Sequence, residues 1–261
     1  MNIQLFRFPI FVKSLLFLCA LGHGAEQDNW YVAWETSLSD CRGVAYYTDP
    51  TSGVGQIYVT SSSSDDIKVY DLNGSLARSI TIASSRNYPT DLVLDENGII
   101  YIVEYCAVTC LENDGTFKWR TGKNASISDY GTSGSGDGEF YWASGITIGQ
   151  DGNLYIADNY NHRVQALDKN GNFLRTFGEN GTAPGQLNNP YDVACLPDGR
   201  IVVGDYSYLH YFQPDGTFLK RETSGRYNVS VGPDGTIFSS GKLLDLEGVQ
   251  ITYISDLKNN P

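Results

Sequence analysis

The chain has 261 residues, of which 41% are hydrophobic and 18% charged, so it can form one globular domain with a buried core or two small ones. Its 30 acidic residues outnumber its 18 basic ones, and the formal net charge of −12 argues against a protein that binds nucleic acid or an anionic membrane surface. Glycine (28) and tyrosine (18) are abundant, which is typical of an all-β protein with many turns.

The N-terminal residues 1–25 have the pattern of a signal peptide. Two basic residues, Arg7 and Lys13, precede a short apolar run over 15–21, and small residues follow it. The run is too short to span a bilayer comfortably, and no longer one follows. We therefore expect a secreted protein whose mature chain, 26–261, is a single domain that does not insert into the membrane. The alternative is an uncleaved N-terminal anchor.

Five segments along the mature chain share one design. Each contains an apolar strand, a turn with glycine and a second strand rich in Ile, Val and Tyr, and a second hairpin follows. The turns of these second hairpins are Asn-Gly, Asp-Gly or Glu-Gly. Asn-Gly and Asp-Gly predict tight hairpins in which both central residues have positive φ. The five innermost strands are expected to begin at Gly43, Asp91, Gly145, Asp192 and Asn228.

Repeated four-stranded antiparallel sheets predict a β-propeller, because one blade cannot bury both of its faces whereas a ring of blades can. Five complete repeats favour five blades, with six as the alternative. A further strand candidate at 29–34 would either join the last blade and close the ring or be the remnant of a sixth blade. The polar, glycine-rich segment 122–144 is expected to lie over one face of the ring.

Residues 135–178 closely resemble the NHL repeat. They contain a Gly-x-Gly-x-Phe lead-in, a Gly-Ile-x-Ile strand, Asp-Gly-Asn-Leu-Tyr-Ile-Ala-Asp and Asn-His-Arg-Val-Gln. Residues 184–205 match less completely, and the other repeats match in outline. NHL-type propellers include secreted lyases, RNA-binding modules of ubiquitin ligases and extracellular interaction domains. The resemblance therefore implies a fold and leaves the activity open.

The most conspicuous polar residues of the repeats have structural interpretations. The peptide-amidating lyases of this fold resemble zinc enzymes built on several histidines, whereas the mature chain has two, His162 and His210. We expect His162 to cap a turn. Glu104, Asp158 and Asp205 occupy one position of their repeats and are expected to cap the turn that follows.

One set of polar residues is a candidate site in the central channel. Asp91, Asp192 and Asn228 each begin an innermost strand, so they are expected to converge at one end of the channel. Their oxygen atoms could bind Ca²⁺ or another divalent cation. Such a cation would be structural, or would activate a lactone as in gluconolactonase-like and paraoxonase-like propellers. Alternatively, these side chains satisfy backbone groups or line a wet channel.

A second candidate site is a binding face made of aromatic residues on the long loop and the neighbouring repeats. Aromatic side chains are enriched at recognition surfaces because they combine a large contact area with a polar group. The candidates are Tyr130, Trp142, Tyr191, Tyr206 and Tyr208, and Tyr141 lies with them on the long loop.

Covalent modifications are also expected in a secreted chain. Cys106 and Cys110 could form a disulfide in an oxidising compartment. Asn-x-Ser/Thr sequences mark four candidate glycosylation sites, Asn73, Asn124, Asn180 and Asn228.

Together, these features favour a secreted, non-enzymatic β-propeller that binds a protein or glycan ligand. The first alternative is a metal-dependent hydrolase or lyase, similar to a lactonase, with its site in the channel. The second is a ubiquitin-ligase-associated or RNA-binding NHL module. The acidic charge and the lack of a RING-like cluster of cysteine and histidine argue against this second alternative.

Overall fold

The computed structural model describes residues 15–20, 30–36, 41–61, 65–82, 88–126, 129, 131–223 and 227–253, and of 15–20, 30–36 and 252–253 it describes the backbone alone. Within these ranges the chain is all β apart from one turn of 3-10 helix, η1 (Asn159–Asn161). None of the helical structure described is long and apolar enough to cross a membrane.

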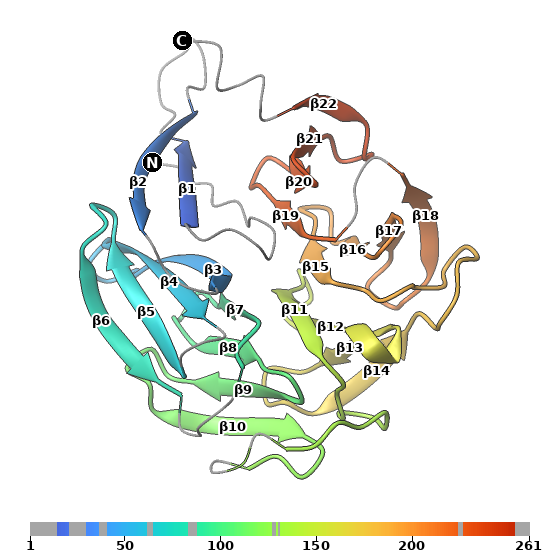
Figure 1. The fold of residues 1–261 in the computed structure, drawn as a ribbon, viewed down its shortest axis with the longest axis horizontal. Coiled ribbons are helices and arrows are strands. Elements are labelled where there is room, and N and C mark those ends of the chain that lie inside the picture. Colours follow the sequence, from blue (N-terminus) through green and yellow to red (C-terminus); the bar gives the residue numbers. More distant parts are fainter. Residues whose placement is uncertain are drawn as a thin grey trace.

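Five four-stranded antiparallel sheets are arranged in a ring, which confirms the predicted β-propeller of five blades (Figure 1). Blade 1 contains β3 (Cys41–Thr48), β4 (Gly55–Ser61), β5 (Asp66–Asp71) and β6 (Leu76–Thr81). Blade 2 contains β7 (Asp91–Leu94), β8 (Ile100–Val103), β9 (Ala107–Leu111) and β10 (Phe117–Gly122). Blade 3 contains β11 (Ala143–Ile148), β12 (Leu154–Asp158), β13 (Arg163–Leu167) and β14 (Phe173–Phe177).

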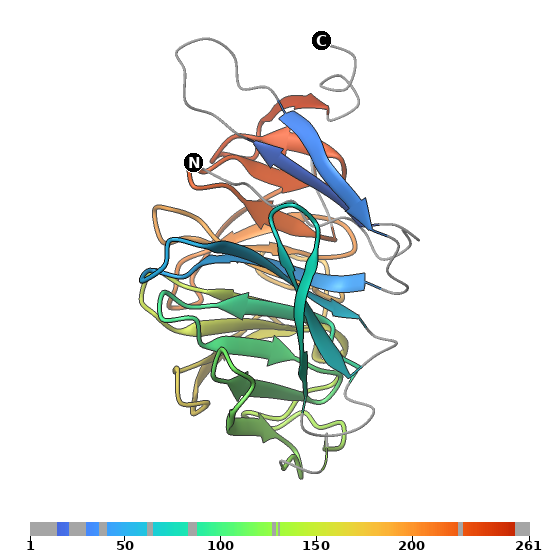
Figure 2. The ribbon, with the colours of Figure 1, turned by 90° about the vertical axis from the view of Figure 1, so that its left-hand side faces the viewer.

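The last two blades complete the ring of four-stranded sheets. Blade 4 contains β15 (Asp192–Cys195), β16 (Ile201–Gly204), β17 (Leu209–Phe212) and β18 (Phe218–Glu222). Blade 5 contains β19 (Val229–Val231), β20 (Ile237–Ser239), β21 (Lys242–Leu244) and β22 (Gln250–Tyr253). The first strand of each blade lies nearest the centre, and the inner strands of successive blades contact each other (Figure 1). Seen from the side, the ring is flatter along its axis than across it (Figure 2).

The strand predicted at 29–34 does not join the last blade. It forms β2 (Trp30–Thr36), which pairs antiparallel with β1 (Leu15–Ala20), and blade 5 is completed by its own strand β22. The β1–β2 pair lies between blade 1 and blade 5 (Figure 1). This position agrees with the alternative of a sixth-blade remnant. Strand β1 lies within the segment predicted to be a signal peptide, and removal of that segment stays a prediction.

The turns of the five outer hairpins differ from the predicted geometry. Their glycines have φ between +78° and +94°, but the preceding Asn, Asp or Glu residues do not have positive φ. A register shift accompanies each hairpin. These features define a type I turn followed by a left-handed glycine in a bulge, instead of a two-residue turn with two positive φ values. The glycines are Gly74, Gly115, Gly171, Gly216 and Gly248.

The hydrophobic core lies between the blades. Four clusters of buried side chains fill the four interfaces between successive blades of the ring, from blades 1 and 2 to blades 4 and 5. Phe140 reaches the cluster between blades 2 and 3 from the long segment 122–144 and is fully buried there. Burial of such a side chain contributes about 1.5–3 kcal/mol, so each blade is stabilised mainly by its neighbours.

The structure corrects the prediction of a disulfide between Cys106 and Cys110, because both are free thiols. Cys110 lies in β9 and packs between blades 2 and 3, whereas the Cys106 sulfur lies 3.6 Å from the hydroxyl of Ser133. Four residues of extended strand span about 13 Å, whereas the Cα atoms of a disulfide lie within about 7 Å of each other. Burial raises the pKa of both thiols, that of Cys110 to about 12.

Gly145 generates the first testable prediction. A Cβ atom at this position would lie 2.4 Å from the Oδ1 atom and 2.8 Å from the Cα atom of Asp192 in the next blade. Because backbone cannot move aside locally, Gly145→Ala is expected to lower the free energy of unfolding by about 1–3 kcal/mol, measured by urea denaturation.

Gly136→Ala is the matched control, because its Cβ would meet only the flexible side chain of Glu139. Equal stability of the Gly145→Ala and Gly136→Ala variants would contradict the close approach of the inner strands.

Candidate functional site

A pocket lies at the end of the central channel where the inner strands begin. It contains the three channel candidates together with two of the predicted aromatic residues. Its lining residues are Arg42, Thr90, Asp91, Trp142, Ser144, Tyr191, Asp192 and Asn228. These side chains come from all five blades, from the start of each inner strand or from the residues just before it.

The two carboxylates of the pocket connect neighbouring blades. Asp91 is 2% exposed, and its Oδ1 and Oδ2 atoms accept the backbone N–H groups of Leu92 at 2.8 Å and of Ile146 at 3.0 Å. The second bond joins blade 2 to blade 3. Asp192 makes the equivalent bonds between blades 4 and 5. It accepts the backbone N–H groups of Val193 at 2.9 Å and of Val229 at 3.1 Å.

This geometry supports the interpretation that the carboxylates satisfy backbone groups. All four oxygens of Asp91 and Asp192 accept backbone N–H groups. Across the described residues, no group of three or more His, Cys, Asp and Glu side chains is arranged to hold a metal ion. A cation at this position would therefore depend on Asn228 and on carboxylates that already have partners.

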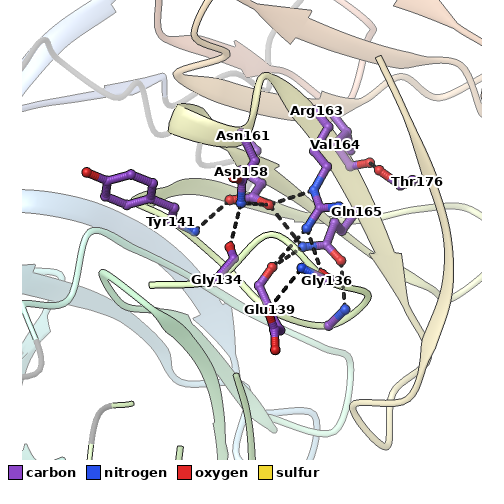
Figure 3. A network of polar contacts seen from close by, with 12 residues as sticks. Gly134, Gly136, Glu139, Tyr141, Asp158, Asn161, Arg163, Val164, Gln165 and Thr176 are labelled. Carbon is purple, nitrogen blue, oxygen red and sulfur yellow. Dashed lines mark hydrogen bonds and ion pairs between the residues drawn. The ribbon is translucent and has the colours of Figure 1, made fainter. Parts of the chain in front are cut away.

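A buried network around Asp158 fixes the loop that leads to Trp142 (Figure 3). The Asp158 carboxylate accepts the backbone N–H of Tyr141 at 2.9 Å and side-chain N–H groups of Asn161, Arg163 and Gln165 at 2.8–3.0 Å. Burial raises the pKa of Asp158 even though these donors favour the charged form.

Two members of the network also bind the loop backbone (Figure 3). Gln165 donates to the carbonyl of Glu139 at 2.7 Å and accepts the N–H of Gly138 at 2.9 Å. Arg163 donates to the carbonyls of Gly136 at 2.8 Å and Glu139 at 3.0 Å. The network therefore holds residues 136–141 against blade 3, just before Trp142.

The two neighbouring blades also have a buried carboxylate at the position of Asp158, but other side chains donate hydrogen bonds to it. In blade 4, Asp205 accepts His210 Nε2 at 3.0 Å, and in blade 2, Glu104 accepts the Thr109 hydroxyl at 2.6 Å and pairs with Arg120 at 2.9 Å. Burial outweighs these partners for Glu104 and raises its pKa to about 7. For Asp205 the bonds from His210 and the backbone outweigh burial, and they lower its pKa.

His162 and His210 are therefore structural in this arrangement. His210 is fully buried beside Asp205. His162 follows η1 with a φ of +56°, and its Nδ1 accepts the backbone N–H of Asn189 at 3.2 Å. This bond fixes the entry to the inner strand β15.

Aromatic side chains surround the pocket on the same face. In one cluster, Tyr160 lies 4.9 Å, between ring centroids, from both Tyr141 and Trp142, and Tyr105 lies 5.6 Å from Trp142. In the second cluster, Tyr227 lies 5.1 Å from Tyr191 and 5.7 Å from Tyr206. We call these seven residues the aromatic face: Tyr105, Tyr141, Trp142, Tyr160, Tyr191, Tyr206 and Tyr227.

Three of these side chains are more than a third exposed: Tyr141 (38%), Tyr160 (40%) and Tyr206 (53%). Of the predicted candidates, Tyr208 does not join the face, because its ring packs under the guanidinium of Arg221 at 4.3 Å. Tyr130 lies outside the described residues.

Three residues of the aromatic face were missing from the predicted set: Tyr105, Tyr160 and Tyr227. The repeats contain a signal that would have found two of them. Tyr105 directly follows Glu104 and Tyr160 closely follows Asp158, as Tyr206 follows Asp205. Aligning the one or two residues after each buried carboxylate therefore identifies tyrosines that lie in equivalent loops.

The backbone before the inner strands is strained at the position of Trp142. Trp142 lies three residues before Gly145 and has a φ of +56°. Tyr88 and Asn189 lie three residues before the equivalent Asp91 and Asp192, and have φ of +46° and +54°. Left-handed conformations are unfavourable for bulky residues and concentrate at functional sites. The left-handed backbone before these inner strands therefore orients the three side chains at a cost in stability.

The candidate glycosylation sites occupy two kinds of surroundings. Three of them, Asn73, Asn124 and Asn180, are exposed. The fourth, Asn228, is half-buried and lines the pocket.

A family model of the NHL repeat matches residues 140–167, which run from Phe140 through β11, β12 and β13. The propeller therefore contains an NHL repeat in blade 3. The RING finger protein nhl-1 of Caenorhabditis elegans is 45% identical over 89 residues, which cover 34% of this chain and 9% of that protein. The chain spans less than a tenth of the length of the first curated relatives it matches.

Solved structures share the fold of this NHL-repeat propeller at low identity. Virginiamycin B lyase from Staphylococcus aureus is similar with a TM-score of 0.61 and 13% identity, over 82% of this chain and 70% of the lyase. A gluconolactonase from Xanthomonas campestris is similar with a TM-score of 0.62 and 15% identity, over 83% of this chain and 76% of that enzyme. At this level of identity the likeness shows the fold alone.

The carboxylates of the channel yield a second prediction. Asp91→Ala and Asp192→Ala each leave two buried backbone N–H groups without that acceptor, so each is expected to lower the free energy of unfolding by about 2–4 kcal/mol in urea denaturation. Asp234→Ala is the matched control, because this carboxylate accepts the N–H of Thr236 in an exposed turn.

Calcium and a chelator are expected to leave the melting temperature of this propeller unchanged. A calcium-dependent rise in melting temperature that both variants lose would instead assign the carboxylates to a cation site.

The network around Gln165 yields a third prediction. Gln165→Ala removes the bonds to Gly138 and Glu139, so the amide hydrogens of 136–141 are expected to exchange about tenfold faster, equivalent to ~1.4 kcal/mol of lost protection. Hydrogen exchange detected by mass spectrometry measures the change in exchange rate. Thr176→Ala is the control, because the hydroxyl of Thr176 donates to the carbonyl of Val164 and not to residues 136–141. Unchanged exchange in 136–141 would show that the loop is held by other contacts.

Proposed function

We propose that this NHL-repeat propeller is a secreted binding module that recognises its ligand with the aromatic face around the channel mouth. The main support is the aromatic face itself, where seven aromatic side chains from blades 2 to 5 form two clusters, and each cluster contributes one residue to the lining of the pocket. Exposed aromatic clusters of this kind are enriched at recognition surfaces and provide most of the binding energy there.

Two further observations support a binding role for this face. Trp142 is held in a left-handed conformation by a loop that the buried Asp158 network fixes, so its position is determined before any ligand arrives. A pre-positioned side chain loses little conformational freedom on binding. The basic and apolar pattern of residues 1–25 supports secretion of the module.

A hydrolase or lyase in the channel is the alternative suggested by the fold of the solved relatives. The described residues favour it less, because the carboxylates and histidines near the channel bind backbone or each other. A ubiquitin-ligase-associated or RNA-binding NHL module is the weaker alternative. The net charge of −12 disfavours RNA as the ligand of this chain.

Trp142→Gly tests the proposal with little backbone cost, since glycine adopts the left-handed conformation readily. We expect Trp142→Gly and Tyr206→Ala each to weaken binding of a partner by at least about tenfold in biolayer interferometry, as for central aromatic residues of other interfaces. The partner is first identified by screening immobilised full chain, as secreted, against extracellular proteins and a glycan array.

Leu174→Ala is the control, because Leu174 is 42% exposed on the outer strand β14, away from the channel mouth. Full affinity in the Trp142→Gly/Tyr206→Ala double variant would place the binding surface elsewhere and overturn the proposal.

A further inference from the structure

The pocket at the channel mouth combines aromatic walls with a polar floor. Trp142 belongs to one aromatic cluster and Tyr191 to the other, and both line the pocket. Between them the lining is made of charged and polar side chains: Arg42, Asp91, Asp192 and Asn228. The pocket is therefore lined by both aromatic rings and hydrogen-bonding groups.

The floor mixes hydrogen-bond donors and acceptors. The guanidinium of Arg42 is a donor, the carboxylates are acceptors, and the carboxamide of Asn228 is both. Two hydroxyl groups add acceptor capacity, because Thr90 and Ser144 donate to the carbonyls of Ala143 at 2.7 Å and Pro190 at 3.1 Å. A ligand hydroxyl also both donates and accepts, so a polyhydroxylated ligand matches this floor better than a group with one kind of hydrogen bond.

The charge of the pocket favours a neutral ligand. Arg42 places a positive charge beside the carboxylates and so reduces the attraction for a cationic side chain, although aromatic walls alone would suit one. The net charge of −12 of the chain opposes an anionic ligand. Two aromatic walls match the C–H faces of a pyranose ring, whose hydroxyls lie around its edge.

The size of the cavity limits how much of a ligand can enter. Its volume of about 40 Å³ accommodates the edge of one ring and excludes a folded polypeptide segment. The rest of a longer ligand would lie on the exposed tyrosines outside it, Tyr141, Tyr160 and Tyr206.

We propose that the pocket binds the edge of the terminal sugar of a neutral glycan, a hexose or N-acetylhexosamine, beside Trp142 and Tyr191. The hydroxyls of that sugar bond to the floor at Arg42 and Asn228, and the following sugars lie over the aromatic face. This inference rests on the proposed function and names the ligand class of the same site.

The first test titrates the full chain, as secreted, with methyl glycosides of glucose, galactose, mannose and N-acetylglucosamine, and tryptophan fluorescence reports binding. The second test measures binding of the same chain to an array of neutral and sialylated glycans. At least one neutral glycoside is expected to change the fluorescence, and the array to favour neutral termini. Trp142→Gly and Asn228→Asp are each expected to weaken array binding by about tenfold, as for central contact residues.

Two controls separate folding and modification from binding. Leu174→Ala is expected to retain full affinity, and thermal unfolding checks that each variant is folded. Ser230→Ala removes the glycosylation sequence of Asn228 while keeping its side chain. It is expected to bind at least as well as the unchanged chain, because no glycan on Asn228 can then occupy the pocket.

The outcomes distinguish this inference from the proposed function. Binding of a protein, or of a lysine-rich peptide used as a probe, that depends on Trp142 in the absence of any neutral glycan would overturn the glycan inference and leave the binding face in place. Preference for sialylated over neutral termini would also overturn it. If Trp142→Gly binds every ligand as well as the unchanged chain does, both the glycan inference and the proposed binding face are overturned.

Discussion

Each blade needs a neighbour on both sides to cover its apolar faces, and the rest of the structure depends on this constraint. The buried clusters are shared between successive blades, so the inner strands must approach closely around the channel. Gly43 and Gly145 leave the space that Asp91 and Asp192 of the following blades occupy. Each of these carboxylates then binds a backbone N–H of the next blade. The charges that line the channel thus take part in assembling the ring.

Most of the other buried ionisable groups also have a structural role in holding the blades together. A carboxylate ends or directly follows the second strand of blades 2, 3 and 4. It accepts a hydrogen bond from the third strand, from Thr109, Gln165 or His210, which occupy one register position. A buried carboxylate must have donors, and all three side chains provide one. His210 is therefore one of three solutions to a single structural requirement. This leaves the aromatic side chains of the loops, held by these networks, as the groups that meet solvent at the channel mouth.

Much of the fold was predictable from the sequence, because its signals act over short distances. Apolar alternation and glycine-containing turns define a hairpin within about a dozen residues, and repetition along the chain implies the ring. The local details were less accessible. The Asn-Gly and Asp-Gly dipeptides indicated hairpins, but only the strand twist and the bulge determine that the glycine alone has positive φ. Cys106 and Cys110 are close in sequence, yet an extended strand separates them.

The sequence by itself determined the five four-stranded blades and their order, since these follow from local propensity and repetition. It identified Asp91 and Asp192 as the first residues of their inner strands, whereas the other three inner strands begin at Cys41, Ala143 and Val229, within two residues of the predicted Gly43, Gly145 and Asn228. It also marked Trp142, Tyr191 and Tyr206 as candidates. Only the tertiary structure decided which aromatic residues share one face, because Tyr105, Tyr160 and Tyr227 come from different blades and meet only once the blades pack. The left-handed turn before β11 and the hydrogen bonds across blades set those positions, and neither is encoded in the spacing of any single repeat.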